Sequence, residues 1–144
     1  MRNFHVPDHF YLSFLECLLS GKQHVIAIGD EFGLTGIQAI TLLLVNEHEP
    51  RPMKSFCQLF HCDASNVTGI VDGLEQKGLV ERQSDPRDRR VKTISLLPAG
   101  KKMQQQIIDR LQADRNYMFD PLTDTEAQQL IRIIDKIAHA RQLV

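Results

Sequence analysis

Apolar residues recur at helical spacing along the first stretch of the chain, from residue 8 to residue 32. The apolar positions of this stretch are Phe10, Phe14, Leu18, Val25, Ile28 and Phe32. Residues three or four apart share one face of an α-helix, so such a stripe can pack against other apolar surfaces. The pattern therefore predicts one long amphipathic helix over residues 8–32.

Two shorter helices are predicted next. Thr35 and Gln38 match a capping box, in which the threonine caps a helix and the glutamine three residues later bonds back. The apolar positions that follow keep helical spacing, which predicts a helix over residues 36–48, and Pro50 ends it. Residues 53–60 fit a further short helix.

A fourth helix is predicted from residue 63 to about residue 77. Asp63 has the place of its N-cap, and Gly78 stands where helices usually end. One face of this helix is apolar and carries Val67, Ile70, Val71 and Leu74. The other face carries small or polar residues, namely Ser65, Asn66, Thr68, Gly69, Asp72 and Gln76. The helix therefore buries one side and presents small polar groups on the other.

A hairpin and two helices complete the pattern. Residues 79–83 and 91–96 alternate partly as strands do, and residues 85–90 join them. A proline begins a helix over about 98–118, and a second capping box begins a last helix that runs to the C-terminus. A helix-turn-helix followed by a two-stranded hairpin predicts a mainly α fold with a small β-hairpin wing, a winged helix-turn-helix.

The last helix has an unusually wide apolar surface. Its isoleucines are Ile131, Ile133, Ile134 and Ile137. One subunit does not usually cover so much apolar width on a single helix. We expect this helix to contribute to the core and to a dimer surface; the alternative is burial within the monomer.

Charge is divided unevenly along the chain, although the net charge is only −1. Residues 51–102 hold ten Lys and Arg against six Asp and Glu, whereas the rest of the chain holds seven against twelve. The distribution of charge governs anion binding more than its sum does. The basic middle therefore indicates an anionic partner, although a solvated face would carry the same excess.

The length, the ends of the chain and its cysteines indicate a single cytoplasmic domain over residues 1–144. No apolar run approaches the ~20 residues that cross a bilayer, and the N-terminus lacks the features of a signal peptide. The cysteines, Cys17, Cys57 and Cys62, are odd in number. We therefore expect reduced thiols and no disulfide framework.

The cysteines and histidines show no metal-ligand spacing, so neither a metal nor a cofactor is predicted. A peroxide-sensing cysteine needs access and a neighbouring cation or hydrogen-bond donor, and the sequence places none beside Cys17. Packing roles are expected for Cys17, Cys57 and Cys62. The chain also lacks a nucleophile–base pair and a phosphate loop, so it is not expected to be an enzyme.

The fourth predicted helix suits the major groove of DNA. Ser65, Asn66 and Thr68 lie in its first turns and can hydrogen-bond bases or phosphates. The alternative is that these residues serve only helix capping and solubility.

The turn at residues 85–90 places Arg87, Arg89 and Arg90 at the tip of the hairpin. Arginine suits the narrow minor groove, where the potential is most negative. A carboxylate can hold the planar guanidinium at two points, so we expect Asp88 to orient Arg90. The alternative is an ordinary solvated charged turn.

Residues 63–100 resemble the MarR family of bacterial and archaeal regulators. The helix, the Lys77-Gly78 break, the acidic-basic turn and the Pro-Ala-Gly at 98–100 occur in family order. Positions 69 and 73, often large or basic in relatives, are both glycine here. Base reading is therefore expected to fall more heavily on the polar residues at 65, 66 and 68.

The resemblance implies a homodimer that binds a pseudo-palindromic operator in double-stranded DNA. It assigns DNA binding to about residues 35–97 and dimerisation to about 8–32 and 98–144. Many relatives respond to a small phenolic or lipophilic effector, and others sense peroxides through a cysteine. The hypothesis is a ligand-responsive repressor with no assigned ligand residues. The alternatives are a winged-helix interaction module without DNA binding and a cysteine-based redox-sensing regulator.

Overall fold

The computed structural model describes residues 5–114 and 119–140 of the chain. Its elements in chain order are α1 (Asp8–Glu31), α2 (Gly36–Leu44), β1 (Arg51–Pro52), α3 (Met53–Phe60), α4 (Ala64–Gln76), β2 (Val80–Ser84), β3 (Lys92–Leu96), α5 (Pro98–Ala113) and α6 (Asp124–Ala140). This order confirms the predicted fold class. The predicted ends of the last two helices, at 115–118 and 141–144, lie outside the described residues.

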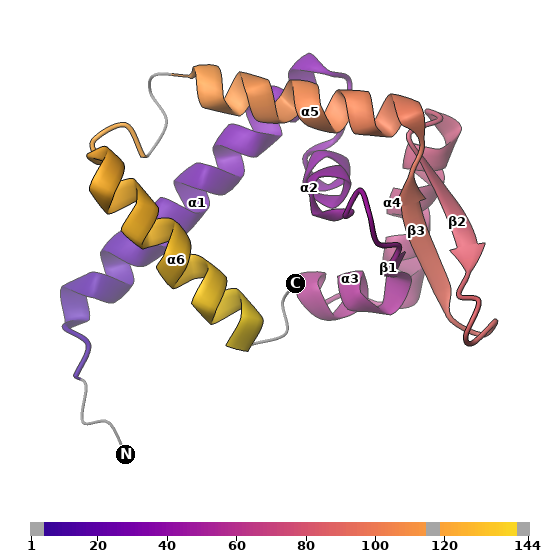
Figure 1. Cartoon of the computed structure of the whole chain (residues 1–144), viewed down its shortest axis with the longest axis horizontal. Coiled ribbons are helices and arrows are strands. Elements are labelled where there is room, and N and C mark those ends of the chain that lie inside the picture. Colours follow the sequence, from indigo (N-terminus) through magenta and orange to yellow (C-terminus); the bar gives the residue numbers. More distant parts are fainter. Residues whose placement is uncertain (1–4, 115–118, 141–144) are drawn as a thin grey trace.

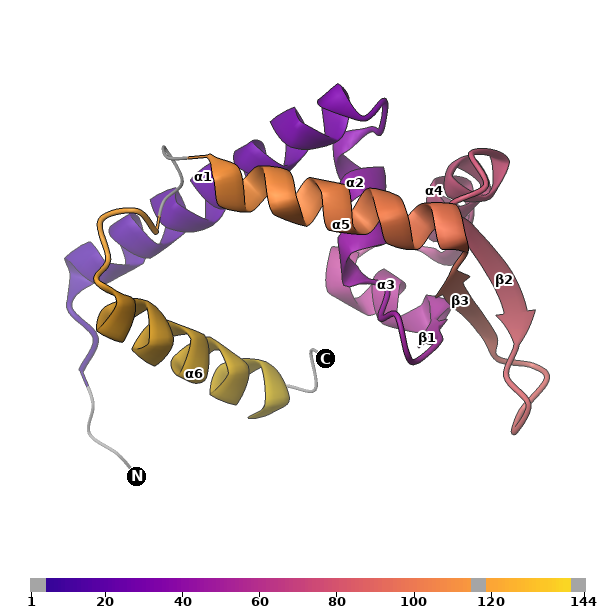
Figure 2. The same cartoon turned by 45° about the horizontal axis from the view of Figure 1, so that its top comes forward.

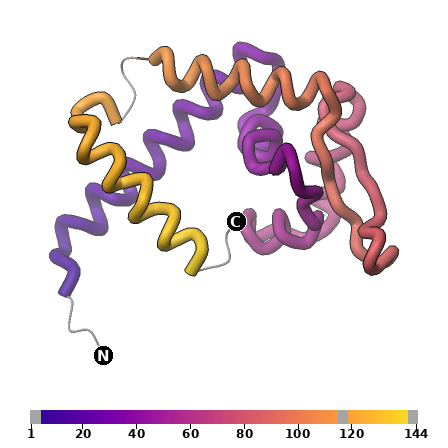
Figure 3. Tube along the Cα trace, viewed as in Figure 1, coloured from indigo at the N-terminus to yellow at the C-terminus, as the bar shows by residue number. Residues whose placement is uncertain are grey.

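The elements form two parts joined by α5 (Figure 1). Helices α2, α3 and α4 lie together with the sheet at one end. Helix α6 and the first half of α1 lie at the other end, and the turned view in Figure 2 agrees. Helix α5 starts at the sheet and runs back to α1, against which it packs. The Cα trace in Figure 3 shows α6 and the start of α1 extending away from the winged helix-turn-helix.

Helix α2 begins as predicted but ends earlier. The capping box is present, with Thr35 N–H donating to Gln38 Oε1 at 3.1 Å and Gln38 N–H donating to Thr35 Oγ1 at 3.4 Å. The helix stops at Leu44 rather than at 48, because Val45 is extended and buried in the core. Side chains take over the carbonyls at this end, which makes an early end inexpensive.

Two side chains from distant elements satisfy the end of α2. Arg51 donates from its guanidinium to Leu44 O at 2.8 Å. Gln104 on α5 donates from Nε2 to Leu42 O at 2.8 Å and to Val45 O at 2.9 Å. Nothing local in the sequence specifies these partners, which explains why the predicted helix was too long.

A third strand, β1, joins the predicted hairpin. The sheet order is β1-β3-β2 and both pairings are antiparallel. Val80 pairs with Leu96 at one end of the hairpin, and Arg51 pairs with Ile94 on the other side of β3. A two-residue strand is too short to show alternation, so the sequence pattern did not predict it.

The sheet and α5 meet at Gly100. The backbone comes so close that a Cβ at this position would lie 1.9 Å from Leu79 O. Only glycine permits that approach. Leu97 N–H also donates to Leu79 O at 3.0 Å, so the start of α5 is held firmly against the wing.

The core lies mainly in the winged helix-turn-helix, and Ile28 of α1 and Ile107 of α5 complete it. Its largest fully buried side chains include Phe56, Leu42, Leu74, Ile94 and Ile107. Of the described residues of α1, only Ile28 and Gly29 are buried, and none of α6 is. The isoleucines of α6 are 49–59% exposed. The last helix is therefore not part of this core, and the alternative of burial within the monomer is wrong.

Both helices outside the core leave apolar surface uncovered. On α1 the exposed large apolar residues are Phe10, Tyr11, Leu12, Phe14, Leu15, Leu18 and Leu19. In the described part of the chain no single helix is long and apolar enough to cross a membrane. The pair α1 and α2, bent by 101°, meets that test by length and composition only.

Candidate nucleic-acid interface

The start of α4 is held by its N-cap, Asp63. One carboxylate oxygen accepts the Asn66 backbone N–H at 3.0 Å and the Ser65 hydroxyl at 2.7 Å. These two bonds, that from Ser65 first, hold the pKa of Asp63 below its usual value. The Ser65 hydroxyl therefore serves the cap as a donor and keeps its lone pairs for an incoming donor. Asn66 is exposed.

Thr68 and the two glycines of α4 face different surroundings. Thr68 is half-buried and lines the space between α4 and the wing. A Cβ at Gly69 would meet nothing within 4 Å, so this position is open. A Cβ at Gly73 would lie 2.3 Å from Gln38 Nε2 on α2. Gly73 therefore faces the Gln38 side chain on α2, whereas Gly69 faces open space.

The wing turn carries two carboxylate–arginine pairs. Asp88 holds Arg90 through Nε to Oδ1 and through the terminal nitrogen to Oδ2, both at 3.1 Å. It also accepts the Arg90 backbone N–H at 3.0 Å. The predicted pairing of these residues is thus present. Hydrogen bonds from the Arg90 side chain and backbone lower the pKa of Asp88.

The second pair repeats this arrangement at the start of the turn. Asp85 accepts the Arg87 backbone N–H at 2.8 Å and its Nε at 3.4 Å. Arg87 and Arg90 are 89% and 91% exposed along their side chains. Exposed ion pairs add little to stability, so the effect of both carboxylates is to orient cations toward solvent. Arg89 is exposed at the tip between them.

A cluster that the sequence analysis missed links α4 to the wing. Arg82 on β2 donates from its backbone N–H to Glu75 Oε1 at 2.8 Å and from Nε to Glu75 Oε2 at 2.9 Å. It also pairs with Asp72. The hydrogen bond to Arg82 lowers the pKa of Glu75, and the bonds to Glu75 and Asp72 raise the pKa of Arg82. We call these three residues the Arg82 cluster.

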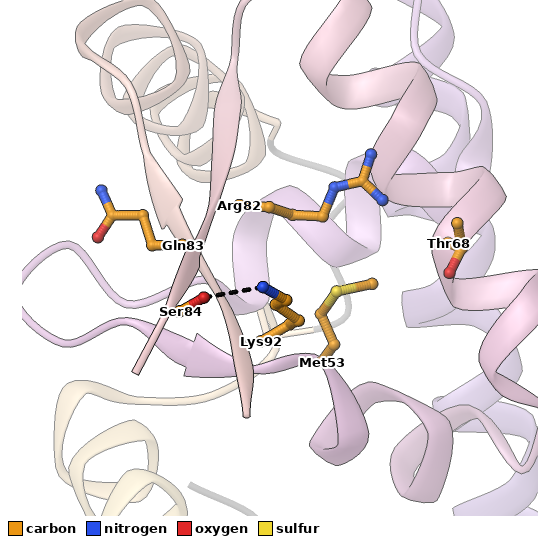
Figure 4. Close-up of a pocket in the computed structure, with 6 residues that line it drawn as sticks. All are labelled: Met53, Thr68, Arg82, Gln83, Ser84 and Lys92. Atoms are coloured by element: carbon orange, nitrogen blue, oxygen red, sulfur yellow. Dashed lines mark hydrogen bonds between the residues drawn. The ribbon is translucent and has the colours of Figure 1, made fainter. Parts of the chain in front are cut away.

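A cleft separates the helix-turn-helix from the wing. We call it the wing cleft; its volume is about 620 Å³, and its lining includes Met53, Lys54, Cys57, Thr68, Arg90 and Lys92. An adjoining cavity of about 460 Å³ extends it along β2. Figure 4 shows that cavity, with Lys92, Arg82 and Met53 between the strands and Thr68, and with Lys92 Nζ donating to Ser84 Oγ at 2.8 Å.

The wing cleft brings together two of the predicted residues, Thr68 and Arg90. The other predicted residues, Ser65, Asn66, Arg87, Asp88 and Arg89, are not part of its lining. Thr68 comes from the helix and Arg90 from the hairpin, and Lys54 and Lys92 add two cations that the sequence analysis did not single out. Their signal was only the basic excess of the middle of the chain. A surface of this kind, a polar helix start beside a basic hairpin, fits the two grooves of duplex DNA.

The cysteines divide into two environments. Cys57 and Cys62 are free, half-buried and packed against the core, as predicted. Cys17 is exposed on α1, so the expectation of core packing is wrong. The apolar residues of α1 have the spacing of a core face, but the rest of the single chain does not cover them. Among the described residues no three His, Cys, Asp or Glu side chains gather as a metal site.

This fold and this site define a DNA-binding winged helix-turn-helix protein. A family model described as the MarR family matches residues 32–91. The helix-turn-helix-type transcriptional regulator YsmB of Bacillus subtilis is 30% identical over 118 residues, which are 82% of this chain and 81% of YsmB. The chain belongs to the MarR family of transcriptional regulators.

Two further similarities agree with this assignment. The transcriptional repressor MdtR of Bacillus subtilis is 28% identical over 110 residues, 76% of this chain and 71% of MdtR. A crystal structure of a MarR-family regulator from Rhodococcus sp. RHA1 covers 93% of this chain and 98% of its own, with a TM-score of 0.69 and 25% identity. These relatives are transcriptional regulators, in agreement with the family to which this chain belongs.

Proposed function

We propose that this regulator is a homodimeric repressor that binds a pseudo-palindromic operator and responds to a small phenolic or lipophilic effector. The observation that carries the DNA-binding part is the wing cleft, because it joins the start of α4 to the arginine that Asp88 orients. In this proposal Ser65, Asn66 and Thr68 enter the major groove. Arg87, Arg89 and Arg90 enter the adjacent minor groove, with Asp88 aiming Arg90.

The uncovered helices support the dimer. Large apolar side chains on α1 and four isoleucines on α6 are exposed in the single chain. Contiguous apolar surface of this kind marks an association site. A second copy supplies a matching surface by two-fold symmetry, and two-fold symmetry requires a two-fold operator. We accordingly assign dimerisation to residues 8–32 and 98–144 and DNA binding to residues 35–97.

The repressor role and the effector rest on similarity. MdtR is by its name a repressor, and the family resemblance implies a small effector. A regulator that occupies its operator without effector blocks transcription there. An effector that binds the free dimer more tightly than the bound one then lowers operator affinity.

Selection of duplex DNA from a random pool tests the DNA-binding part. The selected sites should contain two inverted half-sites about 10–10.5 base pairs apart, centre to centre. Binding should weaken steeply as salt rises, because neutralised phosphates release counterions. A pool that shows no enrichment at low salt would contradict the proposal. Repeating the selection with candidate phenolic compounds tests the effector.

A further inference from the structure

Two of the three cysteines stand at the joint between the helices of the helix-turn-helix. Helix α3 ends at Phe60, and His61 then takes the left-handed conformation with φ 50°. The backbone N–H of Cys62 donates to Cys57 O at 3.2 Å. This is the six-to-one hydrogen bond of a Schellman motif, whose two end residues commonly touch through their side chains. Cys57 and Cys62 occupy those two ends.

The backbone geometry permits a bond between the two sulfurs. A hydrogen bond between two backbone units sets their Cα atoms about 5–6.5 Å apart, and a disulfide spans Cα separations of about 4.4–6.8 Å. Both thiols are free, half-buried and packed against the same core. The expected Cα separation therefore lies within the range that a disulfide spans.

One of the two thiols is open to reagents. Cys57 lines the wing cleft, whereas Cys62 is absent from its lining. The cleft also carries Lys54, Arg90 and Lys92, so it attracts anions. An anionic small disulfide can reach Cys57 by this route.

We propose that Cys57 and Cys62 form a redox-active dithiol, which anionic low-molecular-weight disulfides oxidise to an intrachain disulfide that weakens operator binding. The effect on operator binding rests on the function proposed above. Formation of the disulfide does not.

The reaction is two successive thiol–disulfide exchanges. The Cys57 thiolate attacks one sulfur of the small disulfide, whose S–S bond breaks and releases one thiolate. The Cys62 sulfur, after losing its proton to solvent, attacks Cys57 and releases the second thiolate. The two leaving groups take up the two protons. The cysteines lose two electrons and the small disulfide gains them.

The order of the two cysteines follows from their surroundings. Cys57 faces the open cleft and therefore meets the reagent first. Burial, and to a lesser extent the neighbouring Cys57 and Asp63, raises the pKa of the Cys62 thiol. Cys62 is thus the resolving thiol, and the second exchange should accelerate as pH rises because the thiolate fraction grows.

Cys62 is the residue through which the disulfide would affect the start of α4. Cys62 directly precedes Asp63, whose carboxylate holds the Ser65 hydroxyl and the Asn66 backbone N–H. We expect a disulfide at Cys62 to restrain the residue before this cap and so to disturb the first turn of α4. Disturbing an N-cap should lower operator affinity about fivefold.

The test uses the full chain with Cys17→Ser, so that two thiols remain. The protein is incubated with oxidised glutathione, or with neutral hydroxyethyl disulfide at the same concentration, and free thiols are then alkylated. Intact mass should show a form that has lost two hydrogens and carries no alkyl group. It should form faster with glutathione at low salt, and salt should remove that advantage. Cys62→Ser and Cys62→Ala, checked for folding by circular dichroism, should stop at a mixed disulfide.

The same samples are then measured for binding to the selected duplex. Affinity should fall about fivefold on oxidation and return with reductant. The Cys62 variants cannot form the intrachain bond, so they should not show the loss of affinity that this bond causes. Two alkylated cysteines after oxidation would overturn the dithiol. A complete disulfide with unchanged affinity would overturn its regulatory effect. Failure of the reduced protein to bind any duplex would instead count against the proposed function, because the mass measurement decides the dithiol on its own.

Discussion

At the residue scale, the wing turn carries an arginine whose side chain is held in one orientation by a neighbouring carboxylate. Asp88 contacts Arg90 at three points, counting both side-chain nitrogens and the backbone N–H. An arginine that is already aimed loses less conformational freedom when it enters a minor groove. The carboxylate thus subtracts one unit of positive charge from the tip but adds orientation.

Substitution of the wing pair should separate these two effects. Arg90→Ala should weaken operator binding by about 1–3 kcal/mol, and Asp88→Ala by less, since it removes orientation and not the cation. Fluorescence anisotropy with a labelled operator measures both. Lys22→Ala on α1 removes one charge far from the wing and is the matched control. Full affinity in both wing variants would contradict the proposed role of the wing.

The two glycines of α4 provide a matched pair for stability. Gly69→Ala places its Cβ in open space and should raise the free energy of unfolding by up to about 1 kcal/mol through helix propensity. Gly73→Ala has the same intrinsic gain but must displace the Gln38 amide, so it should stabilise less or destabilise. Urea unfolding measures both changes. A larger gain at 73 than at 69 would contradict the packing described for Gly73.

At the scale of elements, the Arg82 cluster holds α4 and the wing at one angle. Its groups are partly exposed, with side-chain exposures of 28% for Arg82 and 30% for Glu75. Solvent therefore screens the charges, and the contribution of the pair to stability is about 1 kcal/mol or less. The larger effect is geometric, because the cluster fixes the position of the wing relative to α4.

Glu75→Gln should show this contribution through pH. Arg82 lowers the pKa of Glu75 below its ordinary value of 4.5. The stabilisation is therefore present above the unfolded-state pKa and is lost as pH falls through the lower folded-state pKa. Unfolding free energies of wild type and variant should differ at pH 7 and converge toward pH 3. A constant difference across that range would show that the carboxylate charge is not involved.

The sequence predicted those elements whose signals are local. Capping residues and apolar spacing placed α1, α3 and α4 to within about one residue at each end. The pairing of Asp88 with Arg90 was also predictable, because the two residues are only two positions apart. The misses depend on distant partners. Helix α2 ends early because Gln104 satisfies its carbonyls, and Arg82 meets Glu75 only once β2 folds against α4.

At the scale of the whole molecule, apolar spacing predicts a buried face but not which chain buries it. Cys17 and the α6 isoleucines were expected in the core wholly or in part, yet the single chain leaves them exposed. A helix that packs against a second copy has the same pattern as one that packs against its own chain. Amphipathic spacing alone therefore cannot separate a domain core from an oligomer interface.

Ile134→Glu should disrupt the proposed dimer without unfolding the winged helix-turn-helix. The side chain is 49% exposed and outside the core, so the winged helix-turn-helix should stay folded while the dimer dissociates. Sedimentation should show a monomer at micromolar concentration, and circular dichroism should show unchanged helix content. Lys136→Gln, two residues away on the same helix, changes the net charge by the same −1 and is the control. A variant that remains dimeric would remove α6 from the proposed interface.

The Arg82 cluster also has a consequence for how an effector could regulate operator binding. Because the cluster ties β2 to α4, we expect α4 and the wing to move together as one unit. In the proposed dimer two such units must lie about 34 Å apart to match one turn of duplex. The proposed effector would then need to alter neither unit. A change in their separation by a fraction of the groove width would suffice, and helix α5, which packs closely on Leu79 at Gly100, would transmit that change.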